Sequence, residues 1–257
     1  MERILYQFPF SHYCEKARWV LDFKGVPYRI HNQFPGIHAR TNRRLTGRTS
    51  VPLLIEQGQG IAISGSHEIA LHLEARALGP SLLPKSATVR VELDHFIRHF
   101  DDVVGPAVRR YGYSFILARP ALFRDVFFDE YRGVAKLAGR WLARPLTLVI
   151  GNMYRVNATA EVGKLPDLVR SAADRVEARL GGAARTARFL FGDELSLADI
   201  TVASLLGPAI GPAGSPWAMD FDIPQLGKLR EELRARPVGR YVAELYAQRP
   251  ASTASPY

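Results

Sequence analysis

The hydrophobic pattern of the chain changes at Gly79-Pro80-Ser81, and this change constrains the fold more than any other feature. Before it, short apolar runs alternate with segments whose apolar residues recur at helical spacing, which indicates alternating strands and helices. After it only helical spacing is found, beginning with the run from Val89 to Val104. The sequence therefore predicts an α/β domain over residues 1–80 and an all-helical bundle domain over residues 81–257.

The first domain is expected to follow the order βαβ-α-ββα. The βαβ start predicts a parallel pair of strands, and the turn Gln57-Gly58-Gln59-Gly60 predicts an antiparallel hairpin at the end of the domain. The result is a small mixed sheet. The expected strands are residues 3–8, 26–30, 51–56 and 60–64, and the expected helices are residues 14–24, 37–45 and 66–78.

The second domain is expected to contain helices around residues 89–104, 120–143, 163–181, 197–210 and 225–247. Gly105-Pro106 is expected to end or kink the first of them. Most aromatic residues that follow fit helix packing, but Tyr111, Tyr113 and Phe115 are placed in a loop and are candidates for the wall of an apolar pocket.

Composition excludes several classes of function. The net charge of +9 is spread along the chain, and the one local cluster, Arg40, Arg43, Arg44 and Arg48, suits a small polyanion as well as a polymer, so we expect no nucleic-acid partner. A single cysteine excludes a disulfide framework or multi-cysteine metal cluster, and no third ligand accompanies His95 and His99, so no metal is expected. No apolar run suggests a signal peptide or membrane span, which favours a cytoplasmic protein.

The segment Ser11-His12-Tyr13-Cys14 opens the first predicted helix. Unpaired N–H groups and the helix dipole favour an anion there, so this is a place to hold a thiolate. Ser11 is either a plain N-cap or a hydroxyl donor to a bound thiolate. Cys14 is either a small buried hydrophobe or a nucleophile, and dithiol exchange is excluded because position 11 is not a cysteine.

Two further segments carry candidate chemistry. Val51-Pro52 begins a buried strand, so Pro52 is either an ordinary strand start or a cis proline that presents the backbone of Val51 to a ligand strand. Ser66 opens a helix after Ser64-Gly65, where it is either an N-cap or part of a carboxylate site.

Together these segments resemble the thioredoxin-like domain of cytosolic glutathione transferases, the glutathione S-transferase family, in its serine-type form. The resemblance covers residues 1–80 well. It implies that Ser11 activates the sulfur of glutathione, that Val51 before cis Pro52 pairs with the cysteinyl backbone, and that Ser66 holds the γ-glutamyl carboxylate.

The second half supports the resemblance independently. Residues 189–200 are similar to the family's signature in the helical domain, with Ser196 as N-cap, Asp199 as its capping-box partner, and Leu195 and Ile200 as a hydrophobic staple. This signature serves folding. The resemblance further implies a second-substrate pocket, for which the candidates are Phe10, Tyr111, Tyr113 and Phe115, and a homodimer.

The chain departs from the family pattern at two glutathione-binding positions. Gly65 stands where the family usually has an acidic residue, so the contact to the glutathione amine is missing or supplied elsewhere, for example by Glu68. Ser50 stands where the family often has Lys or Gln, so Arg48 or a neighbouring arginine is expected to hold the glycyl carboxylate.

These observations predict a glutathione S-transferase that uses glutathione as co-substrate and attacks a small hydrophobic electrophile. Conjugation, isomerisation and displacement share the activated thiolate, and a detoxification role follows from the resemblance. Two alternatives stay open. One is a thiol transferase in which Cys14 forms a mixed disulfide with glutathione, and the other is a non-catalytic binding or scaffold protein with the same fold.

Overall fold

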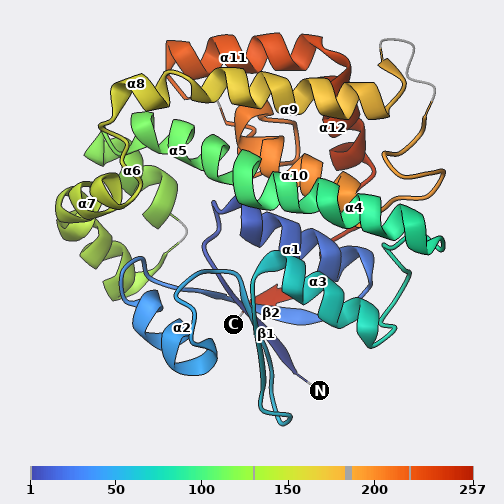
Figure 1. Ribbon diagram of the computed structural model, residues 1–257. Coiled ribbons are helices and arrows are strands. Elements are labelled where there is room, and N and C mark those ends of the chain that lie inside the picture. The colour runs from blue at the N-terminus through green and yellow to red at the C-terminus, as the bar shows by residue number, and fades with distance from the viewer. Residues whose placement is uncertain (1, 130, 183–186, 220, 257) are drawn as a thin grey trace. The chain divides into compact units, whose positions relative to one another are not determined.

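The computed structural model describes residues 2–129, 131–182, 187–219 and 221–256, and the chain divides into two compact units (Figure 1). Unit 1 consists of Met1–Ser81, Ala121–Leu146 and Pro250–Tyr257, and unit 2 of Leu82–Pro120 and Thr147–Arg249. The two-domain boundary after residue 80 stays a prediction. The units differ from it because residues 121–146 and 250–257 group with the N-terminal sheet.

Unit 1 is built on a five-stranded sheet in the order β4-β3-β1-β2-β5. The strands are β1 (Arg3–Gln7), β2 (Tyr28–Asn32), β3 (Leu53–Glu56), β4 (Ile61–Ser64) and β5 (Ala254–Pro256). The pair β1–β2 is parallel and the hairpin β3–β4 is antiparallel, which confirms the predicted mixed sheet. The edge strand β5 pairs in parallel with β2 and was not predicted.

Three helices accompany the first four strands, namely α1 (His12–Phe23), α2 (His38–Thr46) and α3 (Ser66–Ala75). Helices α1 and α3 lie side by side (Figure 1). The apolar residues of α1 that predicted its buried face, Ala17, Val20 and Leu21, are fully buried. At the C-terminal ends of the two helices, Lys24 and Glu74 form an ion pair of 2.7 Å, and the lysine side chain is almost completely buried.

The segment 121–146 belongs to unit 1 through contacts with the loop that follows β2. The hydroxyl of Tyr131 donates a hydrogen bond of 2.6 Å to the carbonyl of Gln33. The ring of Phe34 lies 5.0 Å from that of Phe128, at the end of α6 (Pro120–Phe128). The division between the units falls within the long helix α7 (Gly133–Met153).

Unit 2 is all helical, and its centre is α10 (Leu197–Ile210). Almost every residue of α10 is buried, as expected for a helix that is apolar on all sides. The surrounding elements are α4 (Ala87–His99), the π-helical turn η1 (Phe100–Val104), α5 (Gly105–Ile116), α8 (Thr159–Val162), α9 (Leu165–Arg179), α11 (Pro224–Ala235) and α12 (Pro237–Ala247).

The helix boundaries of the second half needed correction. Gly105-Pro106 ends no helix, because the π-helical turn η1 leads directly into α5. The expectation of an end or a kink is met only by this π-helical turn, which interrupts the regular α-helical bonding just before Pro106. Consequently Tyr111, Tyr113 and Phe115 lie on a helix and not in a loop. Likewise, α6 and α7 replace the single helix expected around residues 120–143, and α11 and α12 replace the one expected around residues 225–247. Among the described helices, none has the length and hydropathy that a membrane crossing requires.

Candidate functional site

The register of the sheet brings the three segments that carry candidate site residues to one end of the sheet. Tyr6 of β1 pairs with Leu53 of β3, and Leu53 pairs with Ser64 of β4. The end of β1, the start of β3 and the end of β4 therefore meet. The segments that continue from these points carry Ser11, Val51 and Ser66, so the fold of unit 1 gathers them at the same end of the sheet.

Ser11 is the N-cap of α1. Its side-chain oxygen accepts a hydrogen bond of 3.4 Å from the backbone N–H of Cys14, and its carbonyl begins the helix by accepting from Glu15 at 2.9 Å. The capping interpretation is therefore confirmed. It does not exclude the donor role, because a hydroxyl that accepts through its oxygen keeps its own hydrogen. Ser11 is half-buried, at a helix end where the dipole favours an anion.

Cys14 has no access to solvent. Burial raises the pKa of its thiol, and the charge of Arg18 and a hydrogen bond with Ser11 lower it by less. The buried thiol is thus held in its protonated form, whereas a nucleophilic cysteine needs an accessible thiolate.

Arg18 was not singled out from the sequence, yet it fixes the loop before Ser11. Its guanidinium donates to the Glu15 carboxylate at 2.7 and 2.9 Å, to the Pro9 carbonyl at 3.0 Å, and to the side chain of Gln7. These contacts join the end of β1 to the first turns of α1. The i, i+3 spacing of Glu15 and Arg18 was the available signal for their pairing.

The Val51–Pro52 peptide bond is cis, so Pro52 is the predicted cis proline, and its role in presenting Val51 to a ligand strand stays a prediction. The Pro52 carbonyl accepts a hydrogen bond of 2.9 Å from Gly65 N–H. Val51 precedes β3, which leaves its backbone N–H and C=O outside the ladder of that strand. This is the arrangement that a ligand strand would need.

Ser66 is the first residue of α3 and is buried, and Gly65 is the N-cap with φ of 110°. The nearby carboxylate of Glu68 is folded back onto Gly65, where a Cβ at position 65 would lie 2.0 Å from Glu68 Oε2. Burial favours a raised pKa for Glu68, but its own backbone N–H and Arg48 outweigh that effect and hold the pKa below its usual value. Glu68 is therefore ionised at neutral pH.

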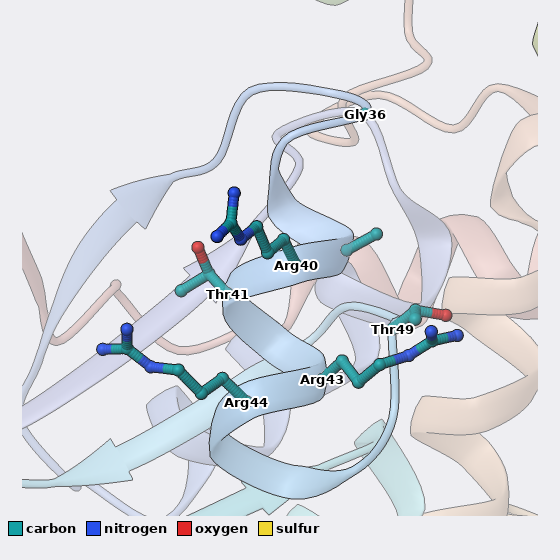
Figure 2. Close-up of a pocket in the computed structure, with 7 residues that line it drawn as sticks. Gly36, Arg40, Thr41, Arg43, Arg44 and Thr49 are labelled. Carbon is teal, nitrogen blue, oxygen red and sulfur yellow. The ribbon is translucent and has the colours of Figure 1, made fainter.

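Arg48 belongs to the loop after α2, and its guanidinium reaches the start of α3. Its Nη1 donates to Glu68 Oε1 at 3.0 Å and to the Ser64 carbonyl at 3.4 Å. Ser50 is exposed, and its carbonyl accepts a hydrogen bond of 3.0 Å from Asn42. The other arginines of the cluster, Arg40, Arg43 and Arg44, lie on α2 around a hollow (Figure 2).

The candidates for the second-substrate pocket belong to both units. In unit 1, the Phe10 ring lies 6.4 Å from that of Phe127. In unit 2, Tyr111 is buried and packs edge-on against Phe115, and Tyr113 packs edge-on against Tyr154. The role of these residues stays a prediction. No group of three metal-ligating side chains occurs among the residues described.

The predicted capping box of α10 is confirmed. The backbone N–H and the hydroxyl of Ser196 each donate to Asp199 Oδ2 at 2.7 Å. Asp199 also accepts from Leu190 N–H at 2.9 Å and from the hydroxyl of Tyr241. Its carboxylate is fully buried, and burial raises its pKa although these hydrogen bonds act in the opposite direction.

The sheet, its flanking helices and the helical second part define a thioredoxin-like domain joined to an all-helical domain. The family model of the glutathione S-transferase N-terminal domain matches residues 5–81, and that of the C-terminal domain matches residues 158–236. Together they cover more than half of the chain. The protein belongs to the glutathione S-transferase family.

Solved structures show the same fold. FzlA from C. crescentus is 21% identical, with a TM-score of 0.56 over 94% of this chain and 92% of that one. The beta-etherase LigF from Sphingobium sp. strain SYK-6 is 20% identical, with a TM-score of 0.59 over 95% and 99%. Glutathione transferase GSTFuA3 from Phanerochaete chrysosporium is 18% identical, with a TM-score of 0.62 over 96% of each chain. A search of curated protein sequences finds no match.

Proposed function

We propose that this protein is a glutathione transferase in which Ser11 stabilises the glutathione thiolate. The observation that carries the proposal is the contrast at the start of α1, where Ser11 is half-buried at the helix end and Cys14 is fully buried behind it. The Ser11 hydroxyl donates to the sulfur and the helix end adds positive potential, so the ionised thiol is favoured.

The reaction then proceeds at the sulfur of glutathione. The thiol proton leaves to solvent, the thiolate attacks an electrophilic carbon, a C–S bond forms, and the leaving group departs with its electron pair. A small hydrophobic electrophile suits this chemistry. The electrophile determines the natural reaction of the protein. This reaction is conjugation, glutathione-dependent isomerisation or displacement.

The rest of the site holds the tripeptide. Val51 pairs with the cysteinyl backbone before cis Pro52, and the first N–H groups of α3 with Ser66 hold the γ-glutamyl carboxylate. The position of the Glu68 carboxylate over Gly65 supports its role as partner of the glutathione ammonium. We assign Arg48 to the γ-glutamyl carboxylate in place of the glycyl one, because its guanidinium lies at the start of α3. When glutathione binds, its γ-glutamyl carboxylate pairs with Arg48 and its ammonium pairs with Glu68. These two contacts replace the ion pair that Arg48 and Glu68 form with each other.

The decisive experiment compares two N-cap serines. Ser11→Ala and Ser86→Ala each remove a cap with nearly the same geometry, since Ser86 accepts from Val89 N–H at 3.5 Å. We expect Ser11→Ala to lower kcat/KM for 1-chloro-2,4-dinitrobenzene about a hundredfold, as for the loss of one donor to a developing anion. Ser86→Ala is expected to retain the rate. Equal rates for Ser11→Ala and the wild type would refute the assignment.

The two alternatives make different predictions. A thiol transferase based on Cys14 requires exposure of a side chain that is fully buried, and its activity on a glutathione mixed disulfide would vanish in Cys14→Ala. A non-catalytic scaffold would show no turnover in either assay. The homodimer implied by the family is a separate prediction, which sedimentation equilibrium tests directly.

A further inference from the structure

Helix α7 turns large apolar side chains toward solvent. More than half of the large apolar side chains that are exposed in the described part of the chain lie on this helix. In the part of α7 that belongs to unit 1 they are Val134, Leu137, Trp141 and Leu142. Val134 is 83% exposed and Trp141 is 79% exposed, so even the largest side chain of the helix has almost no cover within the chain.

The orientation of α7 is determined by its inner face. Gly139 and Ala143, four residues apart, are buried. A Cβ at Gly139 would lie 2.5 Å from Cγ of Phe128, so α7 packs against the end of α6 at a distance that only glycine allows. A rotation that buried Trp141 would bring larger side chains into this contact. The exposure of the apolar residues therefore follows from the packing of the small ones.

Two rows of exposed residues run along the outer side of the helix. The basic row consists of Lys136, Arg140 and Arg144, and the apolar row of Leu137, Trp141 and Pro145. Residues at intervals of four form ridges on a helix, and neighbouring ridges meet at intervals of three, so Arg140 borders Leu137 and Arg144 borders Trp141. Residues 131–160 contain no Asp or Glu, and the preceding Asp129 pairs with Lys136 at 3.0 Å. The outer face of α7 is thus an apolar stripe with a positive edge.

We propose that this face of α7 binds the surface of a lipid bilayer that contains anionic lipid. The apolar row enters the boundary between headgroups and acyl chains, a region in which tryptophan is favoured. The guanidinium groups of Arg140 and Arg144 remain at the level of the headgroups and contact their phosphates. The net charge of +9 attracts the whole protein to such a surface. The helix lies on the membrane and does not cross it.

The charges favour a bilayer over a second copy of the chain. In a twofold-symmetric contact through this face, the basic rows of the two copies would approach each other, and α7 offers no acidic residue to neutralise them. The homodimer predicted from the family is therefore expected to use another face. An acidic protein would match the charge, but the apolar row projects from a single convex helix, to which a fluid bilayer adapts without a preformed groove.

The first test is co-sedimentation with vesicles of phosphatidylcholine alone and of an equal mixture of phosphatidylcholine and phosphatidylglycerol. We expect binding to the mixed vesicles only, and weaker binding at high salt. Leu137→Ser/Trp141→Ser is expected to lower the partition coefficient at least about tenfold. The control Leu45→Ser/Val91→Ser removes exposed apolar side chains from α2 and α4 and is expected to change it less than about twofold.

The positive edge is tested separately. Arg140→Gln/Arg144→Gln is expected to lower the partition coefficient at least about tenfold, because each basic residue near an anionic surface contributes to binding. Arg175→Gln/Lys228→Gln removes the same charge from exposed positions on α9 and α11 and is expected to change it less than about twofold. All four positions are exposed, so both variants should unfold at the urea concentration of the wild type.

Tryptophan fluorescence locates the contact. Trp19 and Trp217 are 1% exposed, so a shift of the emission to shorter wavelength on binding to mixed vesicles reports on Trp141. Trp141→Phe keeps an apolar ring and is expected to bind with less than about a threefold loss, but without the shift. Co-sedimentation of the wild type without a shift would place the contact elsewhere and overturn the proposal.

Other results would also overturn it. They are absence of binding to the mixed vesicles, which would leave the face to a protein partner, equal binding to both kinds of vesicle, and an equal loss in the α7 variants and their controls. Sedimentation equilibrium tests the remaining occupant. Conversion of a dimer into a monomer by Leu137→Ser/Trp141→Ser would assign the face to a second copy of the chain.

Discussion

The carboxylate of Glu68 fills the space beside Gly65, so that a Cβ at position 65 would lie 2.0 Å from Glu68 Oε2. Glu68, three positions further along the chain, thus brings its carboxylate beside position 65, which is the position that the proposed contact to the glutathione ammonium requires. This placement depends on glycine, because position 65 has φ of 110° and ψ of 139°, which residues with a Cβ rarely adopt.

Gly65→Ala is expected to lower the free energy of unfolding by about 1–3 kcal/mol, the range for a residue forced into an unfavourable backbone conformation. Urea denaturation measures the change. Gly65→Ala/Glu68→Ala should recover only the part of the loss that comes from the overlap of the new Cβ with the Glu68 carboxylate, because the backbone strain at position 65 remains. Gly227→Ala is the control, since a Cβ at that helical glycine would have nothing within 4 Å, and it is expected to retain or gain stability.

Glu68→Gln is expected to weaken glutathione binding about tenfold, because it exchanges a charge-assisted hydrogen bond to the ammonium for a neutral one. Calorimetry gives the dissociation constant. The matched control is Glu161→Gln, which alters a surface ion pair of 2.8 Å with Arg110 far along the sequence. An unchanged affinity of Glu68→Gln for glutathione would show that Glu68 is not the partner of the ammonium group.

Cys14 is expected to resist alkylation. Its buried thiol has a raised pKa, so at about pH 8 iodoacetamide should label the folded protein at least about a hundredfold more slowly than the urea-unfolded chain. Mass spectrometry of timed samples measures both rates. Rapid labelling of the folded protein would favour the thiol transferase alternative.

Glu56 is expected to contribute to stability in a pH-dependent way. Its buried carboxylate faces Arg3 at 2.8 Å and His72 and Arg76 at 3.2 Å. Burial alone would raise the pKa of Glu56, but the hydrogen bonds and charges of Arg3 and His72 outweigh it and lower the pKa. The ionised group therefore stabilises the fold above the unfolded-chain pKa of about 4.3, and this contribution is lost as the pH falls toward the folded-state value.

Glu56→Gln should accordingly be less stable than the wild type at about pH 7, and the difference should shrink as the pH falls below about 4. Urea midpoints across this range measure it. The exposed Glu92, replaced by Gln, serves as the control and is expected to follow the wild type closely. A constant difference at every pH would contradict the assigned direction of the shift.

Asp199 is expected to be the most sensitive position of the signature in α10. Asp199→Ala leaves the Leu190 and Ser196 N–H groups and the Tyr241 hydroxyl without their buried acceptor, so we expect a loss of about 3 kcal/mol or more in the free energy of unfolding. Asp193→Ala, at an exposed position nearby, should change it by less than about 0.5 kcal/mol. The folded fraction of Asp199→Ala is expected to bind glutathione normally, since the signature serves folding.

Local patterns predicted much of the fold. Features that act over a few residues could be predicted from the sequence. They include the N-cap Ser11, the periodic apolar residues of α1 and the Ser196–Asp199 capping box. The strand β5 could not be predicted, because Ala254–Pro256 is held by distant partners, such as the 3.0 Å bond from Thr253 N–H to Asp22. The helix through Tyr111 and Phe115 was missed because a loop was expected after Gly105-Pro106, whereas α5 begins at Gly105 directly after the π-helical turn.

The candidate site was predictable only as far as local motifs define it. The positions of Ser11, Val51 and Ser66 follow from motifs, but their convergence depends on strand register. The ion pair of Arg48 and Glu68 joins a loop to a helix twenty residues away and leaves no periodic signal. The i, i+3 spacing signals the pair of Glu15 and Arg18, but the burial of Arg18 and its contacts with Gln7 and Pro9 could not be predicted, because a charged residue on a helix is usually solvated.

The pairing of β5 with β2 has a consequence for how the protein is made. A ribosome delivers the first four strands early, whereas the edge partner of β2 emerges only after all of unit 2 has been synthesised. Until then, β2 presents an open edge during translation, which is a surface prone to pairing with other nascent chains. The open edge of β2 is therefore covered only after residues 254–256 have been synthesised.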